Sequence, residues 1–190
     1  MEVTFIGMNC VKVVGKQVTV LCDPSPTGQP GGDVKGVVDT TLLTRAAEKS
    51  VKTAGRLFDG PGEYEIKGSM ITAVATADES TLYAVSVDGI RVGLLGSVTA
   101  ELTNGQIEAL GGIDVLVFSL KGGEAELSPA TATKIVSQLE PNYVVPINYD
   151  GVLEAFLKEV GSSPEPQPKL KLTSKDLPLE TTVVVLQPQS

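Results

Sequence analysis

The chain has 190 residues, a formal net charge of −8 and no histidine. The missing histidines exclude imidazole as a general base and as a metal ligand. The acidic balance argues against nucleic acid or an anionic membrane surface as a partner. The length and a hydrophobic share of 42% fit one domain, residues 1–190, with a sizeable core.

The first half is expected to be mostly strand, because short runs rich in Val, Thr and Ile alternate with Gly and Pro turns. The expected strands are Val3–Ile6, Cys10–Val14, Gln17–Leu21, Val37–Leu43, Arg56–Phe58, Met70–Thr76, Thr81–Val87 and Arg91–Leu95. Val37–Leu43 is apolar and β-branched almost throughout, which predicts a buried strand. A short helix is expected over Arg45–Lys52.

The second half alternates helix and strand. Thr103 and Gln106 match a capping box, which predicts a helix that ends near Leu110. Ser128-Pro129 predicts the start of a second helix, and the apolar spacing of 152–160 predicts a third. Strands are expected over Asp114–Ser119, Tyr143–Ile147, Leu170–Thr173 and Thr182–Leu186. The pattern by itself favours an α/β or α+β class.

The first residues and the lengths of the apolar runs indicate where the protein is located in the cell. The first residues begin directly as a strand, without the basic and apolar regions of a signal peptide. No apolar run approaches the ~18 residues that a membrane span needs. We therefore expect a cytoplasmic protein without a membrane or nucleic-acid partner. Cys10 and Cys22 are too few for a disulfide scaffold and are expected to be small apolar side chains.

Five short motifs follow one another along essentially the whole chain: Phe5–Val11 (FIGMNCV), Leu21–Pro24 (LCDP), Asp59–Glu65 (DGPGEYE), Leu94–Gly96 (LLG) and Val145–Tyr149 (VPINY). In this order they resemble the compact branch of the metallo-β-lactamase-fold hydrolases that includes L-ascorbate-phosphate lactonase. The resemblance implies the α+β class, a four-layer αββα sandwich, a zinc cofactor and hydrolase activity. It also makes a homo-oligomer an expectation, because this branch often assembles.

The residues depart from that family at its metal ligands. The positions to which the resemblance assigns ligands are Met8, Arg45, Ala47, Lys49, Ser50, Ser97 and Asn148. Arg45 and Lys49 carry positive charge, which repels a metal dication. Without zinc, no bound water is acidified toward neutrality. The sequence therefore predicts the fold but neither a bound metal nor catalytic residues.

Five residues are candidates for a vestigial pocket: Asp23, Arg45, Lys49, Ser97 and Asn148. Three readings of Arg45 and Lys49 stay open. They bind a small anion such as phosphate or carboxylate, they replace the charge of the metal by pairing with Asp23 or a neighbouring acid, or they point to solvent. Asp23 is expected to be structural, in the turn before Pro24. Ser97 and Asn148 are polar enough to contact a ligand, but neither is a base near neutrality.

The main hypothesis is a degenerate metallo-β-lactamase-fold protein without metal or hydrolase activity, with a structural, regulatory or small-ligand-binding role. One alternative is a diverged hydrolase with a rebuilt site that uses Asp23, Lys49 or Cys10, or a metal held by oxygen ligands. The other is an interaction subunit that pairs with active paralogues.

Overall fold

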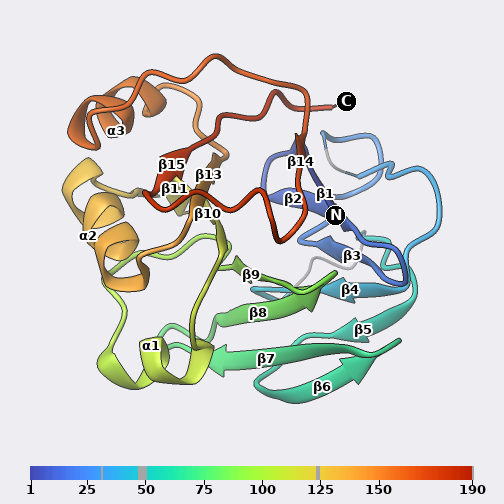
Figure 1. Cartoon of the computed structure of the whole chain (residues 1–190). Helices are drawn as coiled ribbons and strands as arrows, with labels where there is room; N and C mark the ends of the chain where they lie inside the picture. The colour runs from blue at the N-terminus through green and yellow to red at the C-terminus, as the bar shows by residue number, and fades with distance from the viewer. Residues whose placement is uncertain (31, 47–50, 123–124, 190) are drawn as a thin grey trace.

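Two β-sheets pack face to face and three helices cover the outer face of one of them (Figure 1). The computed structural model describes residues 1–30, 32–46, 51–122 and 125–189. The six-stranded sheet has the order β14-β1-β2-β3-β4-β5, and the seven-stranded sheet has the order β15-β13-β10-β9-β8-β7-β6. The predicted α+β class and the two-sheet sandwich are confirmed. Of the four layers expected, the described residues form three, because helices cover only the seven-stranded sheet.

The strands of the six-stranded sheet are β1 (Glu2–Gly7), β2 (Cys10–Val14), β3 (Thr19–Cys22), β4 (Thr40–Leu42), β5 (Arg56–Phe58) and β14 (Leu170–Lys171). Those of the seven-stranded sheet are β6 (Gly62–Ile66), β7 (Ser69–Ala75), β8 (Thr81–Val87), β9 (Ile90–Leu94), β10 (Val115–Ser119), β13 (Tyr143–Ile147) and β15 (Thr182–Val183). β9, β10, β13 and β15 run parallel, as do β3, β4 and β5. A small hairpin of β11 (Lys121–Gly122) and β12 (Ala125–Glu126) was not predicted.

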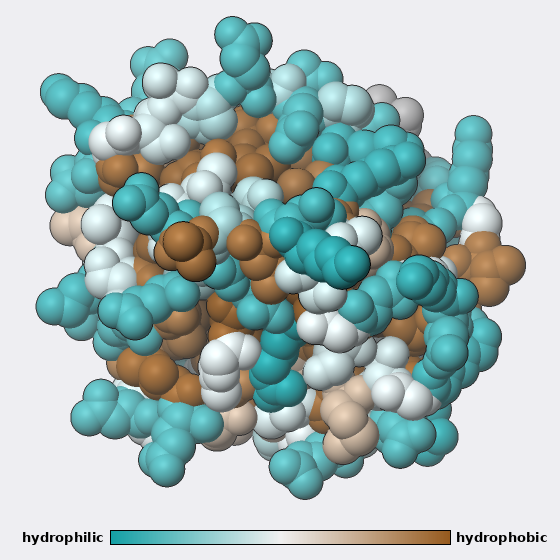
Figure 2. Space-filling model, viewed as in Figure 1, coloured by the Kyte–Doolittle hydropathy of each residue, from teal (hydrophilic) through white to brown (hydrophobic). Residues whose placement is uncertain are grey.

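Two apolar layers hold the molecule together. Between the sheets lie aliphatic side chains such as Val13, Ile71 and Val92, all almost fully buried. Between the seven-stranded sheet and the helices lies a second cluster that includes Leu116 and Phe156. Because β8, β9 and β10 are buried on both faces, their sequences are almost continuously apolar. Figure 2 shows hydrophilic side chains spread over the surface, with apolar patches between them.

The helices are α1 (Asn104–Leu110), α2 (Pro129–Leu139) and α3 (Leu153–Glu159). Their predicted starts are confirmed. Thr103 and Gln106 form both hydrogen bonds of the capping box of α1, and Ser128 caps α2 with Pro129 in its first turn. Among the described residues, no helix is long and apolar enough to cross a membrane.

Two expectations for the segment before β5 differ from the structure: a buried strand from Val37 and a helix over Arg45–Lys52. Val37 is 75% exposed, because β4 begins only at Thr40 and the preceding segment lies outside the sheet. Arg45, Ala46 and the described residues 51–52 are not helical, and 47–50 lie outside the described residues. Where the structure describes the chain, loops and not helices therefore cover the six-stranded sheet. Lys12 Nζ donates to the Lys35 carbonyl and Thr41 Oγ1 donates to the Ala54 carbonyl, both at 2.7 Å.

Candidate functional site

The predicted pocket residues follow strands that end at one edge of the sandwich (Figure 1). Asp23 follows β3, Ser97 follows β9 and Asn148 follows β13. Arg45 comes shortly after β4, which is parallel to β3. Carboxyl ends of parallel strands share an edge, and loops at such an edge are the usual place for a binding site in sheets of this kind. The topology thus brings together residues that are far apart in sequence.

Asp23 fastens the end of β3 to the end of β4. Its two carboxylate oxygens accept hydrogen bonds from the backbone N–H of Thr44, at 2.7 Å, and from the Thr44 hydroxyl, at 2.6 Å. Burial of the carboxyl group raises the pKa of Asp23 to about 6, although the hydrogen bonds from Thr44 oppose this shift. The predicted structural role of Asp23 therefore has a geometric basis, which is a link between two neighbouring strands.

Gly96 comes so close to Thr44 that only glycine fits there. A Cβ on Gly96 would lie 2.1 Å from Thr44 Oγ1, and its φ of +58° is left-handed. Met8, Asp23 and Asn148 also have positive φ values, between +46° and +53°. The edge is thus built from sharp, tightly packed turns at the strand ends.

A chain of hydrogen bonds joins three polar side chains at this edge. Asn148 Nδ2 donates to Asn9 Oδ1 at 3.1 Å, and Asn9 Nδ2 donates to Ser97 Oγ at 2.9 Å. Asn9 lies in the turn between β1 and β2, so the chain connects loops of both sheets. Beside it is a cavity of about 10 Å³, lined by Asn9, Asp23, Gly96 and apolar side chains. Such a space is at most that of one water molecule.

Arg45 bridges two further loops. Its Nη2 donates to Asp78 Oδ2 at 2.6 Å and to the Ser97 carbonyl at 3.1 Å. Nη2 carries two hydrogens, and both are used. A guanidinium holds two oxygens of one anion either side-on, through Nε and Nη2, or end-on, through Nη1 and Nη2. Both arrangements need an Nη2 hydrogen. Arg45 therefore has only single donors left for an anion.

Asp78, the partner of Arg45, is itself held in place. The hydroxyls of Thr76 and Ser80 both donate to its Oδ1. These hydrogen bonds, with a further contribution from Arg45, lower the pKa of Asp78 to about 2. Both members of the ion pair are partly exposed, at 46% for Arg45 and 40% for Asp78. The pair therefore orients the guanidinium more than it stabilises the fold.

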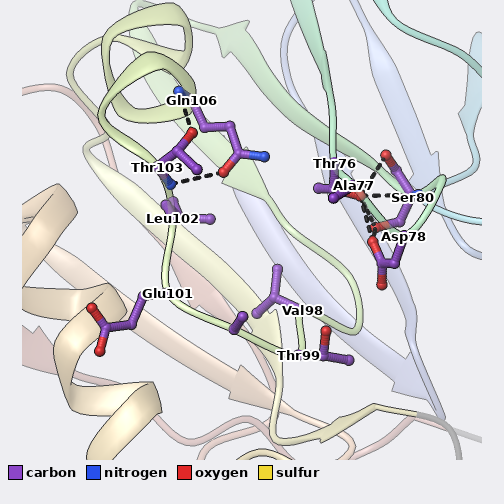
Figure 3. Close-up of a pocket in the computed structure, with 11 residues that line it drawn as sticks. Thr76, Ala77, Asp78, Ser80, Val98, Thr99, Glu101, Leu102, Thr103 and Gln106 are labelled. Atoms are coloured by element: carbon purple, nitrogen blue, oxygen red, sulfur yellow. Dashed lines mark hydrogen bonds between the residues drawn. The ribbon is translucent and has the colours of Figure 1, made fainter.

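Two open pockets lie on either side of this ion pair. One, of about 270 Å³, is lined by Arg45, Met8, Asn9, Asp23 and Thr44 among others. The other, of about 260 Å³, has Asp78 in its wall. Figure 3 shows its two sides, the 76–80 turn on one and the 98–103 segment with the start of α1 on the other. The lining of the second pocket is largely apolar, with Val98 and Leu102.

The structure brings Asp23, Arg45, Ser97 and Asn148 to the same edge, while Lys49 lies outside the described residues. Of the open readings of Arg45, the geometry fits pairing with a neighbouring acid, which is Asp78 and not Asp23. Sequence reasoning missed two participants. Asn9 follows Met8 in the first motif, so a polar side chain next to an expected ligand position could have indicated it. Asp78 lies in a polar turn that carried no such signal.

The donor set at this edge does not fit zinc where the structure describes the chain. The described residues contain no group of three or more His, Cys, Asp or Glu side chains that could hold a metal ion. At the ligand positions, Arg45 contributes a cation, Asn148 directs an N–H toward Asn9, and Met8 is a half-exposed thioether. Zinc requires anionic or neutral donors that point at one centre.

Cys10 does not supply a nucleophile for a rebuilt site. Both cysteines are free and buried, as expected. Burial raises the pKa of Cys10 to about 12, with a further increase from the charge of Asp23. The thiolate is the reactive form of cysteine, so this thiol is inert near neutral pH.

Removing the middle of the hydrogen-bond chain should destabilise the protein. In Asn9→Ala, both Asn148 and Ser97 lose their partner. We expect the free energy of unfolding to fall by about 1–2 kcal/mol, measured by urea denaturation. The exposed Asn104, at the start of α1, is the matched control, and its replacement by alanine should change stability by less than about 0.5 kcal/mol. Equal effects at the two positions would show that the chain contributes nothing.

Comparisons with known proteins agree with this fold. A family model described as "Beta-lactamase superfamily domain" matches residues 2–148. A proposed Zn-dependent hydrolase of the metallo-beta-lactamase superfamily from Thermotoga maritima is 28% identical, with a TM-score of 0.84 and 98% of each chain covered. A proposed metal-dependent hydrolase from Parabacteroides distasonis is 15% identical, with a TM-score of 0.66 and coverage of 97% of this chain and 93% of that chain. The metallo hydrolase Igni18 from Ignicoccus hospitalis is 17% identical, with a TM-score of 0.63 and coverage of 90% and 99%. No curated protein matches the chain.

Proposed function

The chain belongs to the beta-lactamase superfamily, and we propose that it is a member in which hydrogen bonds within the protein have replaced the metal centre. It has lost metal-dependent hydrolysis and acts as a structural, regulatory or small-ligand-binding protein. The fold can host such a change because its function depends on the residues at the loop edge and not on the sandwich.

The observation that carries this proposal is the hydrogen-bond chain from Asn148 through Asn9 to Ser97. Asn148 and Ser97 stand at two positions where the resemblance places metal ligands. Their polar atoms are engaged with Asn9 instead, and the neighbouring cavity has only about 10 Å³. A metal ion would have to break this chain before it could bind.

Arg45 supports the same proposal from a third ligand position. A guanidinium stands where a metal ligand is expected, and it supplies positive charge to the ionised Asp78. Because both Nη2 hydrogens are already used, a small anion in the 270 Å³ pocket gains only single hydrogen bonds from Arg45. We therefore favour the structural role of Arg45 over an anion-binding role. A cytoplasmic location and a homo-oligomer remain parts of this proposal.

The proposal predicts the metal content of the purified protein. Protein prepared without chelator should contain no stoichiometric zinc, iron or manganese by elemental analysis. Titration with Zn²⁺ in a calorimeter should give no saturable binding, and added EDTA should leave the midpoint of thermal unfolding unchanged. Tightly bound metal near one ion per chain, with a thermal midpoint that falls when it is removed, would overturn the proposal and favour a rebuilt metal site.

A further inference from the structure

A groove lined by described residues lies at the edge opposite the vestigial site. It has a volume of about 660 Å³ and runs between α2, α3 and β15. Glu140 ends α2 just before β13 begins, and Thr181 and Thr182 lie at the start of β15. The groove is therefore at the amino ends of these parallel strands, away from Arg45 and Asn148. Figure 2 shows apolar surface between hydrophilic side chains in the region of α3 and β15.

The charge of this groove is negative. Glu140 and Glu159 line it and no lysine or arginine does, and neither carboxylate forms an ion pair with any described residue. The carboxyl-terminal ends of α2 and α3 both meet the groove, and a helix carries partial negative charge at that end. Lys134 and Lys158 are on the same helices but do not line it. The groove thus favours a cation.

The other lining residues add hydroxyl groups and an apolar floor. The Thr133 hydroxyl oxygen is buried and has no hydrogen-bond partner among the described residues, whereas Ser137 and Thr181 donate to backbone carbonyls. Val136, Val160 and Val183 supply aliphatic contacts. A bare metal ion uses neither an apolar floor nor a groove of this size.

We propose that this groove binds an aliphatic diamine or polyamine. One ammonium group lies at Glu140 and another at Glu159, since the two carboxylates come from different helices. The methylene chain between them covers the valines. This site is independent of the replaced metal centre, and nothing in its chemistry requires a reaction.

Calorimetric titration of the whole chain with cadaverine tests the proposal. We expect saturable binding that becomes about tenfold weaker in the double variant Glu140→Gln/Glu159→Gln, because a neutral amide keeps the acceptor but loses the negative charge that attracts each ammonium group. Glu154→Gln is the matched control, since Glu154 is on α3 but outside the groove, and it should leave the affinity unchanged. Mg²⁺ and 1-pentanol, which carry only the charge or only the chain, should bind more weakly than cadaverine.

A second variant separates loss of the site from loss of the fold. Glu140 has a left-handed backbone conformation at the end of α2, with φ of 44°, where glycine is favoured. Glu140→Gly should therefore raise the midpoint of thermal unfolding and still weaken cadaverine binding. The proposal is wrong if cadaverine does not bind saturably, if Mg²⁺ binds equally well, or if Glu154→Gln weakens binding as much as the groove variants do.

Discussion

Gly96→Ala should unfold more easily than the parent chain by about 2–5 kcal/mol, the largest effect that we expect from a single methyl group. An alanine at φ of +58° costs about 1–2 kcal/mol by itself. The added Cβ would also lie 2.1 Å from Thr44 Oγ1 and 2.7 Å from Thr44 Cβ. Overpacking of this kind typically costs a further 1–3 kcal/mol or somewhat more.

Thr44 cannot easily move aside to relieve this clash. Its N–H and hydroxyl are bound to Asp23, and its carbonyl accepts a hydrogen bond from the Thr81 N–H at 2.8 Å. Gly105→Ala is the matched control, because a Cβ on this α1 residue meets nothing within 4 Å. It should stabilise the chain by about 0.5–1 kcal/mol. Urea denaturation followed by circular dichroism measures both, and equal stability of the two variants would refute the close approach at Gly96.

Asp23→Asn should remove a pH dependence of stability between about pH 4 and pH 6. Burial raises the pKa of Asp23 from 3.8 to about 6 in the folded chain. In this window the folded state holds a proton that the unfolded state has released, so rising pH favours unfolding. A pKa shift of this size corresponds to a contribution of at most about 3 kcal/mol to the free energy of unfolding. This contribution is fully lost once the pH exceeds the pKa of Asp23 in the folded chain.

The sign of this effect distinguishes Asp23 from the other acids. Asp78 has a pKa lowered to about 2, so its contribution is present above pH 4 and is lost only as the pH falls below that value. Relative to the parent chain, Asp23→Asn should therefore gain stability as the pH rises from 4.5 to 7. Asp78→Asn, the control, should keep a constant difference from the parent over that range. Denaturant unfolding at several pH values measures both, and a constant difference for Asp23→Asn would contradict the buried charge.

Local sequence signals predicted most of the elements. The capping box at Thr103 and the Ser128-Pro129 pair act over only a few residues, so their helices begin where expected. Apolar runs such as Tyr143–Ile147 predicted strands, and burial on both faces is why this run shows no polar alternation. Val37 was misjudged because its apolar character is local, whereas its exposure depends on where β4 joins the sheet.

The site was predicted as a set of positions but not as a network. The resemblance assigned Arg45, Ser97 and Asn148 to one vestigial pocket, and the structure places all three at one edge of the sandwich. The bond from Asn148 to Asn9 spans 139 positions and that from Arg45 to Asp78 spans 33. No local pattern reports such pairs, since they depend on the order of strands in two sheets. The partner to which each asparagine side chain donates its hydrogen bond also depends on which residues are its neighbours in space.

The hydrogen-bond chain at the loop edge changes how the stability of this fold depends on its surroundings. A protein that is held together by a bound ion gains stability by mass action, so its folded fraction rises and falls with the free ion concentration. The contacts between Asn148, Asn9 and Ser97 are unimolecular, and their contribution is the same at every metal concentration. Under the proposed function, the folded fraction of this chain should therefore not vary with the free metal concentration.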